Sequence, residues 1–176
     1  MNTENETEVT AGDYDAALAL VLGEHERWLD DEDTGRRLDL TRANLYSANL
    51  YYANLDGANL TGATLAGAML YNASLEGANL FEANVRGVNL NQADLTEATL
   101  REANLTGANL SGAMLVEADL DGAALPGATL RNAGLIAADL SGADLTEATV
   151  GEGDLEGLIT IRPATSAHLS HTVRLP

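Results

Sequence analysis

The chain has 176 residues, no cysteine, and 27 acidic against nine basic residues, which gives a formal net charge of −18. This charge argues against nucleic acid or an anionic membrane as a direct partner, but it is compatible with a partner protein that has a basic surface. Without cysteine there is no disulfide framework, and the acidic N-terminus lacks the positive region of a secretory signal, so we expect a cytoplasmic protein.

The first 35 residues differ in character from the rest. Residues 1–11 are acidic and polar, and we expect a disordered tail. Residues 12–35 predict a helix and a solvated turn, since apolar residues recur at helical spacing from Tyr14 to Leu29, with Asp13 as N-cap. The apolar run at 16–22 is too short to span a bilayer. We expect this helix to cap the repeat that follows, and a partner-binding helix is the alternative.

Residues 36–157 contain a five-residue repeat. Leu, or Val at two places, occupies every fifth position from Leu40 to Leu155, which makes 24 units without an insertion. Ala lies two residues before this position in all but three units. A period of five fits neither an α-helix nor a straight strand, and indicates a short strand followed by a corner. The repeated Leu and Ala are therefore predicted to point inward.

The units have the form Ala-Asn-Leu-x-x or Ala-Asp-Leu-x-x, as in Ala53-Asn54-Leu55-Asp56-Gly57, and they resemble the pentapeptide repeat family. The resemblance implies an all-β solenoid, a right-handed quadrilateral parallel β-helix in which four units close one coil. Twenty-four units would give about six coils, hence a rod of roughly 29 Å at a strand separation of about 4.8 Å. The pattern fades after residue 157, and residues 158–176 are predicted to form a C-terminal cap or tail.

With four units per coil, units twenty residues apart share a side, and we name the four sides after Leu45, Leu50, Leu55 and Leu60. The Leu55 and Leu60 sides hold 13 of the 16 acidic residues of the solenoid. Solubility or adaptation to salt would explain this acidity as well as a partner would. The candidate acidic face consists of Asp56, Glu76, Glu82, Asp94, Glu97, Glu102, Glu117, Asp119, Asp121 and Asp139.

The other two sides are nearly neutral and carry the tyrosines of the repeat. Exposed tyrosines beside amides are typical of protein interaction surfaces. Equally, Tyr51 and Tyr71 lie twenty residues apart, so their rings are predicted to stack in a ladder that merely stiffens the solenoid. The candidate interaction surface consists of Tyr46, Tyr51, Tyr52, Tyr71, Asn72 and Asn91.

The residues needed for catalysis are sparse. The imidazoles are His25, His168 and His171, and the last two lack a third metal ligand at a set spacing. Neither a nucleophile with an evident base nor a glycine-rich phosphate loop is found. We therefore predict no enzymatic activity, no cofactor and no metal.

These observations favour a non-enzymatic protein-binding or scaffold module, with a protein partner that the sequence does not identify. The family resemblance also suggests an alternative, a DNA-mimicking modulator of DNA gyrase or another type II topoisomerase, as in quinolone resistance. Roughly 29 Å of B-DNA carries about 17 charges, whereas residues 38–156 carry 16 acids and four Arg. The chain lacks an evident dimerising C-terminal helix. A homodimer or end-to-end association through an uncovered last coil is a further expectation.

Overall fold

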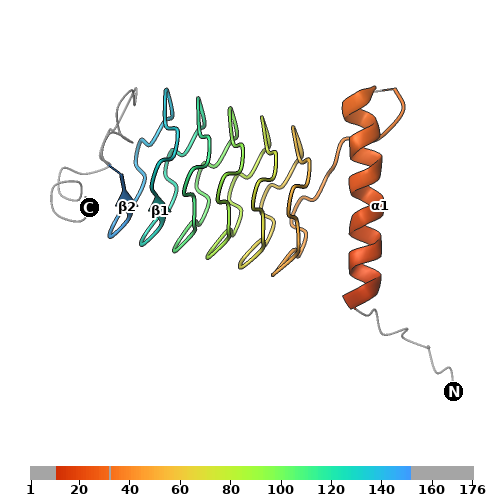
Figure 1. The fold of residues 1–176 in the computed structure, drawn as a ribbon, viewed down its shortest axis with the longest axis horizontal. Coiled ribbons are helices and arrows are strands. Elements are labelled where there is room, and N and C mark those ends of the chain that lie inside the picture. Colours follow the sequence, from red (N-terminus) through yellow and green to blue (C-terminus); the bar gives the residue numbers. More distant parts are fainter. Residues whose placement is uncertain (1–10, 32, 152–176) are drawn as a thin grey trace, which may run out of the picture. The chain divides into compact units, whose positions relative to one another are not determined.

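A computed structural model describes residues 11–31 and 33–151, which fall into two compact units that divide after Leu38 (Figure 1). The first unit contains helix α1, Ala11–Asp30. The second contains the repeat, with the short strands β1, Thr129–Leu130, and β2, Thr149–Val150. Residues 1–10 of the predicted tail at 1–11, the last repeat residues at 152–157 and the predicted cap or tail at 158–176 lie outside the described residues, and the last residue of that tail, Ala11, begins the helix.

Helix α1 confirms the predicted helix and extends it by a few residues. It begins at Ala11, so Asp13 lies inside its first turn and the predicted N-cap is wrong. Gly12 does not prevent the helix from starting at Ala11, because a glycine costs a helix only about 1 kcal/mol relative to alanine. On the predicted apolar face, His25 is buried and Leu18, Leu22, Trp28 and Leu29 are half-buried, whereas Val21 is exposed.

The segment after α1 folds back onto the C-terminal half of the helix. The backbone N–H of Arg36 donates to the Glu24 carbonyl at 3.2 Å, and the N–H of Leu38 donates to His25 Nδ1 at 3.1 Å. A β-carbon at Gly35 would overlap with the backbone of Glu24 and Trp28, so this close approach requires glycine. The segment after the acidic turn is thus held by the helix backbone and the His25 side chain within the first unit, and the cap role of α1 stays a prediction.

Successive coils of the repeat are joined by parallel bridges. The residue before each central Leu bridges the residue twenty positions on, from Asp39 with Asn59 to Ala124 with Asp144. Twenty residues are four units, so each unit forms one of four sides. The bridges involve single residues except at β1 and β2, where two residues pair. The predicted strands are this short because each five-residue unit must also turn a corner.

Each corner is a β-turn with one left-handed residue. The carbonyl of the central Leu accepts the N–H of the next Ala, as between Leu55 and Ala58 at 2.9 Å. The third residue of the turn has a φ of 54° to 70° in all 22 units from Arg42 to Glu147, and ten of these residues are Gly. A positive φ at this position defines a type II turn, which glycine adopts without strain. The remaining twelve residues accept a conformation that L-amino acids disfavour.

The inward residues form one continuous core along the repeat. The central residues from Leu55 to Leu130 are fully buried, and the Ala residues from Ala58 to Ala128 are at least 99% buried. Burial of each Leu contributes about 1.5–3 kcal/mol before conformational entropy is counted. The predicted inward set is confirmed, and function must depend on the residues that point outward.

Candidate interaction surfaces

The polar residue before each central Leu completes the backbone hydrogen bonding of its unit. In the unit 78–82, backbone carbonyls accept four of the five N–H groups, and the N–H of Phe81 donates to Asn79 Oδ1 at 3.0 Å. The same bond to an Asn or Asp side chain recurs in 14 of the described units. An N–H left without an acceptor beside the stacked coils would destabilise the fold. Asn and Asp at this position are therefore structural.

Three acids of the candidate acidic face occupy this structural position. The carboxylates of Asp94, Asp119 and Asp139 accept the N–H two residues on, at 3.0, 3.0 and 2.8 Å. Hydrogen bonds from the Ser141 side chain and backbone lower the pKa of Asp139 below its ordinary value. The sequence alone does not distinguish these three from the other outward acids. Each of the three accepts a hydrogen bond from a backbone N–H of the turn that follows it.

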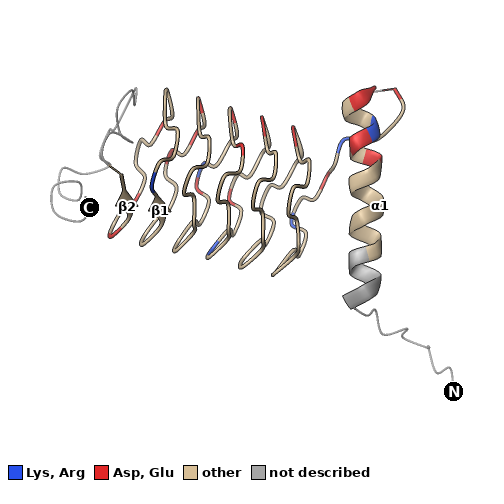
Figure 2. Ribbon diagram, in the orientation of Figure 1, with Lys and Arg blue, Asp and Glu red and all other residues tan. Residues whose placement is uncertain are grey.

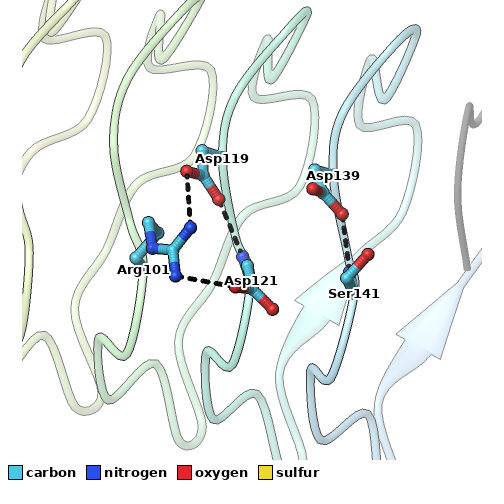
Figure 3. A network of polar contacts seen from close by, with 5 residues as sticks. All are labelled: Arg101, Asp119, Asp121, Asp139 and Ser141. Carbon is cyan, nitrogen blue, oxygen red and sulfur yellow. Dashed lines mark hydrogen bonds and ion pairs between the residues drawn. The ribbon is translucent and has the colours of Figure 1, made fainter. Parts of the chain in front are cut away.

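Two further acids of this face are engaged across coils. Arg101 Nη2 lies 2.9 Å from Asp121 Oδ2, and its Nη1 lies 3.7 Å from Asp119 Oδ2 (Figure 3). Asp56 accepts a hydrogen bond from Ser74 Oγ at 2.6 Å and another from a backbone N–H at 2.9 Å on the next coil. Partly exposed ion pairs of this kind contribute about 0.2–1 kcal/mol. Their larger effect here is to reduce the charge that a partner would meet.

The exposed acids of the candidate acidic face are all glutamates. They are Glu76, Glu82, Glu97, Glu102 and Glu117. All except Glu76 lie at the left-handed corner position, with φ between 54° and 58°. Glu82 with Glu102, and Glu97 with Glu117, are twenty residues apart, so each pair lies on successive coils of one corner. Acidic residues accordingly recur along the solenoid (Figure 2). Of the ten acids of the candidate acidic face, five are therefore exposed and five are half-buried.

Three of the predicted tyrosines form one cluster on the Leu50 side. The Tyr71 ring lies 6.3 Å from that of Tyr51 and 5.8 Å from that of Tyr52, at interplanar angles of 74° and 88°. The rings meet as predicted, but edge to face rather than stacked, which is a preferred arrangement for aromatic quadrupoles. Tyr71 donates its hydroxyl proton to Gln92 Oε1 at 2.9 Å, and the Tyr51 hydroxyl lies 3.2 Å from Met69 Sδ.

These tyrosines differ in exposure. Tyr46 is 69% exposed, Tyr52 is 68% exposed and Tyr51 is 44% exposed, whereas Tyr71 is intermediate. We call Tyr46, Tyr51, Tyr52 and Tyr71 the tyrosine surface. Tyr46 lies on the neighbouring Leu45 side.

The two predicted amides belong to this surface to different degrees. Asn72 is exposed, one coil beyond Tyr52 at the same corner. Asn91 is half-buried and donates its amide to the Ser111 carbonyl at 2.7 Å, so it stabilises the stacking of coils. The Asn72 side chain is therefore accessible to a partner, whereas the Asn91 side chain is engaged in a hydrogen bond within the fold.

Sequence reasoning missed two features of the surface. Met69 contacts the Tyr51 hydroxyl, and its presence where Asn or Asp is typical was the available signal. On the Leu55 side, Met114 and Ile136 are 47% and 61% exposed among the acids. Within residues 11–31 and 33–151, no His, Asp and Glu side chains group in threes so as to hold a metal ion. No described helix is long and apolar enough to cross a membrane.

Comparison with known proteins identifies a family and solved structures that are similar to this chain. The sequence model named Pentapeptide repeats matches residues 39–77, 78–115 and 113–151, with eight copies. The structure is similar to that of HetL, a pentapeptide repeat protein involved in heterocyst differentiation regulation from the cyanobacterium Nostoc sp. strain PCC 7120. That match has 39% identity and a TM-score of 0.51, and covers 64% of this chain and 59% of HetL.

It is also similar to Rfr23, a pentapeptide repeat protein from the cyanobacterium Cyanothece 51142, at 28% identity and a TM-score of 0.51, over 73% of this chain and 95% of that one. QnrB1, a plasmid-mediated fluoroquinolone resistance protein, matches at 16% identity with a TM-score of 0.30, which is too distant to bear on function. A search of curated proteins gave no match.

Proposed function

The chain belongs to the pentapeptide repeat family of right-handed quadrilateral β-helices, and we propose that it is a non-enzymatic module that binds a protein through its tyrosine surface. Members of this family are generally structural or binding modules rather than enzymes. The relative HetL is described as involved in regulation, which is compatible with a binding role. This chain spans less than two thirds of the length of HetL, so the regulatory role of HetL is not assigned to this chain.

The observation that carries the proposal is the environment of Tyr52. Its φ of 57° is left-handed, which costs about 1–2 kcal/mol for an L-residue. Its ring is 68% exposed, so burial offsets little of that cost. The equivalent corner residues on the next coils are Asn72, Gln92 and Gly112, of which Asn72 and Gly112 suit this conformation better. A strained and exposed aromatic residue indicates selection for something other than folding.

The distribution of aromatic residues supports the same surface. Every tyrosine of the repeat lies between Tyr46 and Tyr71, and the rest of the repeat contains a single further aromatic residue, Phe81. Tyrosine is enriched at the energetic centres of protein interfaces. A ladder whose task is to stiffen the rod would be expected along its length. The concentration in the first two coils favours recognition.

The test is partner capture by the double variant Tyr46→Thr, Tyr52→Asn. Both substitutions reproduce residues that the chain already uses at equivalent positions, Thr106 and Asn72, so each variant residue is compatible with the backbone there. Wild-type protein immobilised in native lysate is expected to retain a partner that the double variant loses, at an unchanged melting temperature.

A control variant for this experiment is Glu147→Asn, which introduces asparagine at a distant corner with the same φ of 57°. It should capture the partner as the wild type does. If the double variant retains the partner in full, the tyrosine surface is not the binding site.

A DNA-mimicking modulator of DNA gyrase is the second candidate, and the paired corner glutamates favour it. Their spacing of about 4.8 Å per coil is wider than the roughly 3.4 Å of helix axis over which one DNA strand carries one phosphate. The turn-forming aspartates and Arg101 further reduce the presented charge. A supercoiling assay with purified gyrase tests this role. Inhibition or protection at micromolar concentration, lost in Glu97→Gln with Glu117→Gln, would support it, and no effect would refute it.

A further inference from the structure

We propose, on the basis of the protein-binding function above, that the tyrosine surface accepts an arginine side chain from an extended basic segment of the partner. Tyr52 and Tyr71 contact the guanidinium group, and Glu76 on the adjoining Leu55 side attracts the positive charge of the same segment. The partner chemistry is therefore an arginine-bearing protein segment rather than an apolar helix.

The ring geometry provides the first argument. Tyr52 and Tyr71 stand nearly perpendicular, at 88° with centroids 5.8 Å apart. Tyr71 is fixed through its hydroxyl group, which donates to Gln92, while Tyr52 projects into solvent. Tyr52 is 68% exposed beside this ring, so its π face can attract a cation through the ring quadrupole. The rings are positioned before a partner arrives, so little conformational freedom is lost on binding.

The charge around the rings provides the second argument. In residues 39–78, the charged residues on the Leu50 and Leu55 sides are Asp56 and Glu76, and both are acidic. Asp56 is held by Ser74 and by the backbone of the next coil. Glu76 is exposed, and within the described residues it forms no ion pair. A net charge of −18 adds a long-range attraction for basic segments.

Arginine fits this site better than lysine. Its guanidinium group is planar, is more weakly hydrated than an ammonium group and stacks on aromatic rings. Nucleic acid and anionic lipid carry the wrong charge for this surface.

The spacing of the site suits an extended peptide. Tyr71 and Glu76 are five residues apart along the coil, hence at most about 18 Å. An extended peptide with arginine at alternate positions places successive guanidinium groups about 7 Å apart on one face, so two of them fall within this limit.

The test uses three fluorescent nonapeptides in which alternate positions are arginine, lysine or the neutral isostere citrulline. Fluorescence anisotropy measures binding to the full chain at about 100 mM salt, where exposed charges are partly screened. The arginine peptide should bind several-fold tighter than the lysine peptide, and the citrulline peptide should not bind. Tyr52→Asn, which leaves the charge unchanged, should weaken arginine-peptide binding about fivefold. Glu76→Gln should weaken it by a smaller factor, and Glu147→Gln should leave it unchanged.

Equal affinity of wild type and Tyr52→Asn for the arginine peptide would overturn the proposal, because binding would then follow net charge alone. The proposed function is tested separately by partner capture. If the double variant Tyr46→Thr, Tyr52→Asn loses its partner but keeps its peptide affinity, the tyrosine surface binds a protein of different chemistry. If peptide affinity falls while partner capture is intact, the arginine site stands and the proposed function fails.

Discussion

Substitution of Asn79 by Ala tests whether the residue before each central Leu is structural. Asn79 Oδ1 accepts the N–H of Phe81 at 3.0 Å, and it is the acceptor for the fifth N–H of its unit. Removal of the acceptor leaves this half-buried N–H to water or to no partner, at a cost of about 1 kcal/mol. Asn79→Asp retains an acceptor oxygen at the same place and should remain close to wild-type stability.

The expected change in melting temperature follows from the size of the solenoid. Its 113 described residues, 39–151, correspond to an unfolding entropy of about 0.24 kcal/mol per kelvin. A loss of about 1 kcal/mol therefore lowers the melting temperature by about 4 °C. Scanning calorimetry of wild type, Asn79→Ala and Asn79→Asp measures this difference. Equal melting temperatures for Asn79→Ala and wild type would show that the N–H needs no side-chain acceptor.

Three further predictions concern the corner, the core and the turn. Ala137→Gly relieves a φ of 61° and should raise the stability by about 0.5–1 kcal/mol in urea unfolding, and a decrease would contradict the strain argument. Leu95→Asp places a charge in the closed core and should prevent folding. Thr96→Asp lies on the outside and should change the melting temperature little, and equal effects of the two variants would refute the inward assignment of Leu95. The lowered pKa of Asp139 means that the unfolded chain binds its proton more readily, so its stabilising effect is present above pH 4 and is lost as the pH falls through the folded pKa. Asp139→Asn should therefore reduce stability at pH 7 more than at pH 3, and an equal reduction at both would contradict this assignment.

The periodic residues were predictable from sequence because they obey a local rule. Leu at every fifth position and Ala two before it fix which side chains are buried, and Leu95 and Ala98 lie where the period places them. The four sides follow from twenty-residue bridging, which confirms the assignment of Tyr51 and Tyr71 to one side. These features need no knowledge of long-range contacts.

The division of the polar residues between fold and surface was not predictable in the same way. Asp139 and Glu117 are both outward acids in the sequence, but one accepts a turn N–H and the other is exposed at a left-handed corner. The difference depends on which backbone N–H groups the stacked coils leave without a carbonyl, and this is known only once the coils are stacked. The edge-to-face packing of Tyr52 on Tyr71 likewise depends on side-chain rotation, which the period does not determine.

Site-specific photo-crosslinking tests the binding role of the tyrosine surface most directly. The photoreactive residue p-benzoylphenylalanine replaces Tyr46 in one variant and Thr106 in another, and both positions lie on the Leu45 side, three coils apart. Irradiation in cells followed by mass spectrometry identifies what each position touches. We predict a crosslinked protein partner from position 46 and none from position 106. A partner captured from position 106 and absent from position 46 would contradict the account.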